Sequence, residues 1–378
     1  MTPQPDRKAD IRAAMSDSSV PSSSPRPRPR RMWWSANNIS GIYVWIAIIC
    51  LFGVWRPSLF LTQDTAKEIL NQSGITGIVA LSLVVPLASG LFDLSIGATV
   101  GLTAIGTTWL LQDTSWSVGP VILVALAMAL VVGLVNALVV VGFGIDSFIG
   151  TLAMGGIIDA IGIAISGNQT LGGRIAGQPG YDIAGLNFYG ITAPVFYMFF
   201  IMVVMGIVLE RFQVGRFWYA IGYDREVARL AGIRVKTAEA GSLIISSLLA
   251  GAAGILLAGR LGTTTPLLGD AYLLPAFAAV FLGSTQFRPG RYNAWGTVLA
   301  VLLLGTGQYG LILVGAPQWS PNVFQGAALI IAVGVIQLTK KGGPGPGRLS
   351  ERLLRRRRLE EEKVLDPDSA STGAPAGD

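Results

Sequence analysis

The sequence predicts an all-α membrane protein with about ten transmembrane helices. Hydrophobic residues make up 51% of its 378 positions and charged residues only 13%, a balance typical of proteins that span a bilayer. Apolar segments recur along the chain, and most are near the roughly 20 residues that a spanning helix needs. The Lys and Arg residues are concentrated in a few of the intervening segments. We therefore expect a multi-pass helical membrane protein.

Residues 1–38 are rich in Ser, Pro and Arg, and we expect a disordered cytosolic arm whose arginines lie on anionic lipid. Residues 39–338 form the predicted transmembrane domain, and residues 339–378 a charged cytosolic tail with a short surface helix. The ten apolar segments are Ile39–Trp55, Gln72–Ser89, Ser95–Leu111, Val118–Val141, Ser147–Ser166, Gly190–Leu209, Ala240–Gly259, Ala271–Gly283, Ala294–Val314 and Pro321–Leu338. The eighth is short, so the predicted number of helices is ten within about one.

The distribution of basic residues supports this topology. With a cytosolic N-terminus and ten alternating helices, 24 of the 28 Lys and Arg residues fall on the inside, where the positive-inside rule places them. Both termini and residues 210–239 are therefore predicted to be cytosolic. In the predicted inside turn Gly283–Gly296, we expect Arg288 and Arg291 to bind lipid headgroups or a partner protein.

The charged segment 210–239 contains a predicted short helix within Ala220–Val235 (AIGYDREVARLAGIRV). Asp224 suits the N-cap, and Gly232 suits the left-handed position after the last turn. Three apolar side chains share one face at i, i+3, i+4 spacing: Val227, Leu230 and Ala231. Two turns are far below the roughly 12–15 residues that an isolated helix needs in water. We therefore expect this helix to dock into a groove of a partner protein, the alternative being a solvated basic loop.

The stretch Ser89–Gly97 (SGLFDLSIG) separates two apolar segments without a hydrophilic loop. In one interpretation Asp93 caps a helix that begins near Leu94, while Gly97 and Gly101 let a neighbouring helix approach closely. In the other, the break lines the path of a transported solute, because irregular backbone at this depth is tolerated only inside protein or beside a water-filled cavity. The candidate path residues here are Phe92, Asp93 and Ser95.

Asp159, in the fifth apolar segment, is the other acidic residue predicted to lie inside the membrane. An ionisable residue at such depth is a functional candidate by default, and packing against a polar neighbour is the alternative. The predicted outside loop Gly167–Tyr189 is rich in amides, glycine and aromatic residues. Asn168 and Gln169 there have amides that suit a polyol, although an ordinary surface loop is the interpretation that the sequence favours.

Several classes of chemistry are excluded by absent residues. The chain has no histidine and one cysteine, Cys50, so the usual general base, proton relay, disulfide and metal clusters are missing. It has no GxxxxGK[ST] phosphate-binding loop and no GxSxG or HExxH motif. We expect no enzymatic activity, metal or cofactor in this chain, and no nucleic-acid partner.

Six stretches, in this order, resemble the ribose/xylose-type permease subunits of bacterial ABC importers. They are Gly90–Gly97, Gly133–Thr151, Ala220–Val235, Ala278–Gly283, Gly296–Gly305 and Gly310–Gly315. The resemblance implies a type II-like permease fold and a dimer with a second permease subunit. It also implies two cytosolic ATPase subunits, which bind the ATP, and an extracytoplasmic sugar-binding protein.

The resemblance further implies that Ala220–Val235 holds the coupling helix that docks on the ATPase. The residues carried over are Gly222, Asp224, Glu226, Ala228, Arg229 and Gly232, to which the apolar face adds Val227 and Leu230. We therefore expect an ATP-driven importer of a sugar or polyol. The rivals are an ABC permease for branched-chain amino acids or nucleosides, and an ion-coupled transporter in which Asp93 and Asp159 carry the ion.

Overall fold

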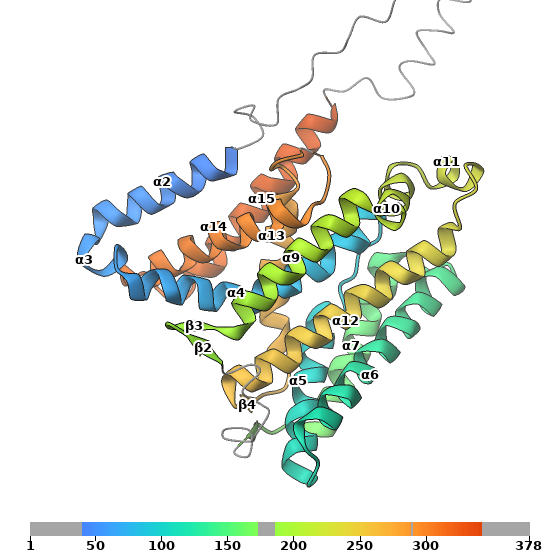
Figure 1. The fold of residues 1–378 in the computed structure, drawn as a ribbon, viewed down its shortest axis with the longest axis horizontal. Coiled ribbons are helices and arrows are strands. Elements are labelled where there is room, and N and C mark those ends of the chain that lie inside the picture. Colours follow the sequence, from blue (N-terminus) through green and yellow to red (C-terminus); the bar gives the residue numbers. More distant parts are fainter. Residues whose placement is uncertain (1–39, 173–185, 289, 342–378) are drawn as a thin grey trace, which may run out of the picture. The chain divides into compact units, whose positions relative to one another are not determined.

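The structure, a computed structural model, describes residues 40–172, 186–288 and 290–341 (Figure 1). The predictions for residues 1–38, for the tail beyond Lys341 and for most of the loop Gly167–Tyr189 lie outside these ranges. The helices are α2 (Ser40–Trp55), α3 (Pro57–Phe60), α4 (Gln63–Ala88), α5 (Ile96–Asp113), α6 (Val118–Ala137), α7 (Ser147–Ser166), α9 (Ala193–Arg211), α10 (Gln213–Tyr223), α11 (Arg225–Leu230), α12 (Val235–Leu261), α13 (Leu273–Gly283), α14 (Ala294–Leu313) and α15 (Ser320–Lys341).

Each predicted apolar segment overlaps a helix. Among the described residues, six helices are long and apolar enough to cross a membrane: α4, α6 with its extension, α7, α9, α12 and α14. Shorter apolar helical stretches are Gly41–Trp55 of α2, Leu268–Gly283 across η3 (Leu268–Tyr272) and α13, and Ser320–Gly334 of α15. The structure therefore confirms a helical membrane protein with six candidate spans.

The second apolar segment is longer than its hydropathy indicated. Helix α4 begins at Gln63, nine residues before the predicted start at Gln72, because the Thr62 side chain accepts a hydrogen bond from the Thr65 N–H at 3.2 Å. This first part of α4 is polar, so a prediction based on apolar runs did not include it. In the most apolar window of α4, 83% of residues are buried, against 28% for α7. Helix α4 is thus the central helix of the domain.

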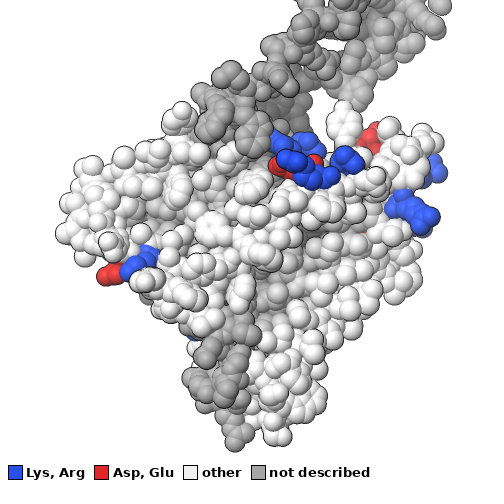
Figure 2. All heavy atoms as spheres, viewed as in Figure 1, with Lys and Arg blue, Asp and Glu red and all other residues white. Residues whose placement is uncertain are grey.

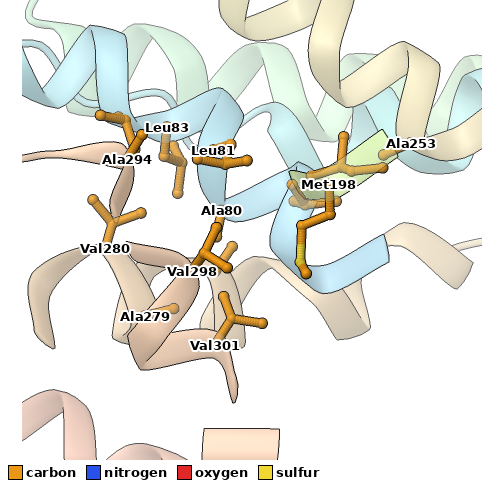
Figure 3. Close-up of a cluster of buried hydrophobic side chains, with 14 of the residues drawn as sticks. Ala80, Leu81, Leu83, Met198, Ala253, Ala279, Val280, Ala294, Val298 and Val301 are labelled. Atoms are coloured by element: carbon orange, nitrogen blue, oxygen red, sulfur yellow. The ribbon is translucent and has the colours of Figure 1, made fainter. Parts of the chain in front are cut away.

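The core forms where α4 meets α9, α12, α13 and α14. Figure 3 shows Leu81 and Leu83 of α4 among small residues of the surrounding helices, including Ala253, Ala279 and Ala294. Helix α12 also packs along α6 and α5, and Figure 1 shows α12 alongside α6. Small side chains at these contacts let the backbones approach closely, which is how helices associate where lipid removes the hydrophobic driving force.

Helix α5 is almost wholly buried although it is rich in threonine. Its hydroxyls do not need external partners, because each bonds the backbone of the preceding turn: Thr99 to Ser95 O, Thr103 to Thr99 O and Thr107 to Thr103 O, at 2.6–2.9 Å. The expected close approach at Gly97 is found, and its partner is Gly269 of η3. A Cβ on Gly269 would collide with the Gly97 carbonyl oxygen.

Two local features were not predicted. Helix α6 ends in a π-helical turn, η2 (Leu138–Gly142), within a segment expected to be one regular helix. Four two-residue strands also occur in the loops: β1 (Leu171–Gly172) pairs antiparallel with β4 (Thr263–Thr264), and β2 (Asn187–Phe188) with β3 (Ile191–Thr192). These short pairs close loops and leave the all-helical architecture unchanged.

Candidate functional site

The segment 210–239 holds two helices rather than the single short one expected. The amphipathic helix α10 leads to α11, and Asp224 separates them. The Asp224 carboxylate accepts hydrogen bonds from the N–H groups of Glu226 and Val227, both at 3.0 Å. The predicted N-cap is therefore confirmed, since these are donors that a helix start leaves unpaired.

The other end of α11 closes in a Schellman motif. The Gly232 N–H donates to Arg229 O at 3.0 Å, and the Ile233 N–H reaches back to Ala228 O at 3.1 Å. Gly232 has φ +82°, a left-handed conformation that glycine adopts without strain. The predicted helix stop at Gly232 is thus confirmed.

The candidate coupling residues divide into two groups. Val227 and Leu230 are 61% and 79% exposed, and Ala231 is exposed beside them, so this apolar face is free for a partner. Ala228 is only 3% exposed and packs with Ile221 and Val235 of its own chain. The side chain of Ala228 therefore points inward, away from the exposed face of α11, and its place in the coupling helix stays a prediction.

Contacts within the chain also hold α11 in place. Arg225 donates from Nε and Nη2 to the two carboxylate oxygens of Glu239 at 2.7 and 3.1 Å. Glu226 and Arg229 form a more exposed ion pair at 2.8 Å. The expectation that only a partner could hold so short a helix is wrong, because the Arg225–Glu239 pair and the packing of Ala228 tie it to α12.

Gly222 has a close-packing role. A side chain at this position would collide with the carbonyl oxygen of Ala88, and Gly90 lies next to it. The indole of Trp218 donates to Ala238 O at 2.9 Å, which joins α10 to α12. The end of α10 is therefore in contact with the break between α4 and α5.

The turn after α13 also packs against this region. Arg288 forms an ion pair with Glu210 at 3.2 Å, and Arg291 lies 4.0 Å above the ring of Tyr219. The structure adds contacts within the chain for these two arginines, and their binding to lipid headgroups or a partner stays a prediction. The Tyr219 hydroxyl donates to the Tyr292 carbonyl oxygen at 2.5 Å. Burial raises the pKa of Tyr219, so this donor stays protonated at neutral pH.

Basic side chains gather on the α10–α11 side of the molecule. Figure 2 shows Lys and Arg concentrated where α10 and α11 lie in Figure 1, with a smaller group near the start of α4. A pocket of about 300 Å³ lies among the basic residues, lined by Arg225, Arg229, Arg234, Val235, Lys236 and Thr237. The sequence indicated a basic segment but not this pocket.

The break between α4 and α5 is built around Asp93, which is fully buried. Its Oδ1 accepts from the Ser95 N–H at 3.1 Å and from the Ser95 hydroxyl at 2.7 Å. Helix α5 begins at Ile96 with Ser95 as its N-cap residue. Asp93 therefore bonds the residue before the helix instead of capping a helix that starts at Leu94, which corrects the predicted start.

A buried polar cluster surrounds this turn. Asn136 of α6 donates from Nδ2 to the Ser95 hydroxyl at 2.7 Å. Two buried oxygens on the neighbouring α6 and α12 make no hydrogen bond: Asn136 Oδ1 and Ser247 Oγ. Asp93 and Ser95 are both inaccessible to a solute in this conformation, whereas Phe92 is 37% exposed and packs edge-on against Phe148.

The six candidate path residues do not form one site. The break is bound to the start of α7, where the Leu94 N–H donates to the Thr151 hydroxyl at 2.9 Å. Asn168 and Gln169 follow the other end of α7, whose 20 residues span about 30 Å. Both amides are exposed in the turn after the helix. The structure thus separates this pair from Phe92, Asp93 and Ser95.

Asp159 lies between these two ends and is half-buried. Its electrostatic neighbour is Asp270 of η3, which is exposed. Sequence reasoning missed Asp270, which lies one residue before the predicted apolar segment Ala271–Gly283. The two carboxylates lie on α7 and η3, and both elements pack on α5. They present acceptor oxygens of the kind that sugar hydroxyls bind.

A second polar surface was also missed. Uncharged polar side chains line a cavity of about 30 Å³ between α4, α13 and α14: Gln72, Ser73, Thr76 and Gln308. The Ser73 hydroxyl is buried without a hydrogen-bond partner. The cavity holds about one water molecule, so it is a polar indentation rather than a ready-made solute site. Within the described residues, no group of three acidic, Cys or His side chains is placed to hold a metal ion.

The sequence matches a known family over most of its length. The model of the family described as "Branched-chain amino acid transport system / permease component" matches residues 65–333, from the first turn of α4 into α15. The chain belongs to this permease family. It is the membrane permease subunit of an ABC-type importer, a transport protein and not an enzyme, and it resides in the cell membrane.

Three curated relatives show how the similarity is distributed. The autoinducer 2 import system permease protein LsrD of Photorhabdus laumondii is 30% identical over 298 residues, which are 75% of this chain and 86% of the relative. The ribose import permease protein RbsC of Bacillus subtilis is 29% identical, with 78% and 89% covered. The D-allose transport system permease protein AlsC of Escherichia coli is 28% identical, with 79% and 91% covered. No solved structure has a significant match to the chain.

Proposed function

We propose that this chain forms the translocation path for a sugar or polyol in an ATP-driven importer. The observation that carries the proposal is the similarity to import permeases named for ribose and D-allose, over about three quarters of the chain. Two separate groups of polar side chains agree with it: the carboxylates on α7 and η3, and the amides beside the cavity between α4, α13 and α14. Asp159, Asp270, Gln72 and Gln308 present carboxylates and amides, which suit a solute made of hydroxyl groups.

The rival importer of branched-chain amino acids shares the family description, so the family alone does not separate the two. An amino acid brings a carboxylate that needs a positive partner. The residue that interacts electrostatically with Asp159 is the acidic Asp270, and Gln72 donates from Nε2 to the carboxylate of Glu68 at 3.1 Å, so neither supplies a positive partner for a carboxylate. This charge pattern favours a neutral, hydroxylated solute.

In this proposal the chain acts within a complex. It pairs with a second permease subunit, receives solute from an extracytoplasmic binding protein and contacts two cytosolic ATPase subunits, which bind the ATP. The type II-like arrangement of about ten helices with both termini cytosolic places α10 and α11 on the ATPase side. The exposed Val227 and Leu230 are then the docking face, worth roughly 1–3 kcal/mol per side chain when buried.

The contact between Gly222 and the α4–α5 break supports a route for coupling. When the ATPases close on ATP, the docked α11 moves with them. Because α10 touches Ala88 and Gly90, this movement reaches the turn that holds Asp93. Thr151 at the start of α7 is hydrogen-bonded to the same turn, so the rearrangement extends to the helix that carries Asp159.

The direct test is reconstitution in vesicles of the full complex, with the binding protein and the ATPase subunits. Radiolabelled ribose, allose and leucine are offered in parallel, with ATP or without it. We expect uptake of a sugar that requires ATP and survives a protonophore. ATP-independent uptake that a protonophore abolishes would identify an ion-coupled carrier. ATP-dependent uptake of leucine alone would establish the amino-acid rival.

A further inference from the structure

The basic pocket beside α11 is the feature that the proposed function leaves unexplained. It has a volume of about 300 Å³ and is lined by Arg225 and Arg229 of α11, by Arg234, and by Val235, Lys236 and Thr237 at the start of α12. Four of these six residues are cationic. All four are exposed, so their charged groups are available at the surface.

The charges of the pocket are only partly neutralised. Arg225 pairs with Glu239, and Arg229 pairs with Glu226. Neither Arg234 nor Lys236 forms an ion pair with any residue that the structure describes. Four cations against two carboxylates leave a net charge of about +2 in the pocket, which therefore attracts an anionic group.

The neighbouring apolar face is too small to form an interface alone. Helix α11 has six residues and presents two large apolar side chains, Val227 and Leu230. A stable protein interface buries about 800 Å² on each partner. The surface that docks α11 must therefore extend onto adjoining residues, and the pocket adjoins it because Arg225 and Arg229 belong to the same helix.

We propose that this pocket receives an acidic side chain of the ATPase subunit that docks on α11, an inference that rests on the proposed function. Arg234 supplies a planar donor pair that matches a carboxylate, and Lys236 supplies a second positive charge. The contact is then apolar at Val227 and Leu230 and ionic beside them. The ionic part fixes the orientation of the ATPase and makes its association sensitive to salt.

The test measures how much ATPase subunit a tagged, full-length permease retains in detergent without anionic lipid, at low and at high salt. R234Q/K236Q removes the two unpaired charges. R211Q/R216Q is the matched control, because it removes two exposed arginines from the same predicted cytosolic side but outside the pocket. We expect R234Q/K236Q to weaken retention at low salt about tenfold and to lose most of its salt dependence, while R211Q/R216Q behaves as wild type.

Two results would overturn the proposal. Retention by R234Q/K236Q at the wild-type level overturns the proposal. A loss of co-purifying phosphatidylglycerol from that variant, with unchanged ATPase retention, assigns the pocket to a lipid headgroup and also overturns it. L230D separates the docking of α11 on the ATPase from the role of the pocket. If the wild type retains no ATPase at all, the proposed function fails and the pocket assignment with it. If L230D abolishes retention but R234Q/K236Q does not, only the pocket assignment fails.

Discussion

Gly222 at the end of α10 packs directly against Gly90 in the break between α4 and α5. A Cβ on Gly90 would lie 3.5 Å from the Cα of Gly222, and a Cβ on Gly222 would collide with the carbonyl oxygen of Ala88. These two glycines bring the helices beside the proposed docking face into backbone contact with the irregular turn that buries Asp93. The contact joins the two features that the sequence singled out separately.

Replacing Gly222 tests this contact. Because the added methyl group of G222A meets a backbone carbonyl, we expect a destabilisation of about 1–3 kcal/mol and loss of ATP-coupled uptake. G241A is the control, since a Cβ there meets nothing within 4 Å. Thermal unfolding followed by size-exclusion chromatography compares the variants. Equal unfolding temperatures for G222A and G241A would show that the close approach at Gly222 does not contribute to stability.

The Arg225–Glu239 pair is expected to anchor α11 to α12. Glu239 is 4% exposed, so R225Q leaves a nearly buried carboxylate without its partner. Since Arg225 remains half-exposed, the loss is about 1–3 kcal/mol, and R225Q/E239Q recovers part of it. A double-mutant cycle on thermal stability measures the coupling. Additive effects of the two substitutions would contradict an anchoring role.

Asp93 is expected to act on structure rather than on solute. D93N keeps an oxygen that accepts from Ser95, so we expect folded yield and uptake near the wild-type level. D93A removes both hydrogen bonds and is expected to lose folded protein. Yield is measured by size exclusion and transport by uptake. A well-folded D93N with its half-saturation concentration raised severalfold would instead place Asp93 in the solute path.

Asp159 and Asp270 are expected to behave in the opposite way. Both are at least partly exposed, and their charges interact. D159N and D270N should therefore fold normally, while the half-saturation concentration for uptake rises about fivefold to tenfold through loss of charged acceptors. N168A/Q169A is the comparison, since that pair lies at the end of α7 away from the break. A similar effect of all three variants would contradict this division.

Periodicity and capping residues allowed most of the helices to be predicted from sequence. Asp224 and Gly232 defined α11 correctly because N-caps and left-handed stops depend on local chemistry. A prediction based on apolar runs missed the first part of α4, because the residues that follow its N-cap are polar. Such a prediction also did not reveal that Ala228 points inward, since the direction of a side chain depends on the distant Ile221 and Val235.

The candidate path could not be assembled from sequence for a related reason. Asp159 and Asp270 are more than one hundred residues apart, and only the packing of α7 and η3 on α5 makes them neighbours. Glu239 was similarly overlooked because its partner Arg225 belongs to another helix. Conversely, Asn168 was predicted to line the path because of its amide, but it lies in the turn after α7, away from the break between α4 and α5.

Crosslinking from α11 tests whether this helix docks on the ATPase subunit. In a C50S background, the only native thiol is absent, and single cysteines are placed at Val227, Leu230 and the buried control Ala228. A thiol-to-amine crosslinker is then applied to the assembled, transport-active complex. If α11 docks on the ATPase subunit, we expect V227C and L230C to crosslink the permease to that subunit. We expect A228C not to crosslink. An active complex in which neither V227C nor L230C crosslinks to the ATPase would contradict the docking of α11.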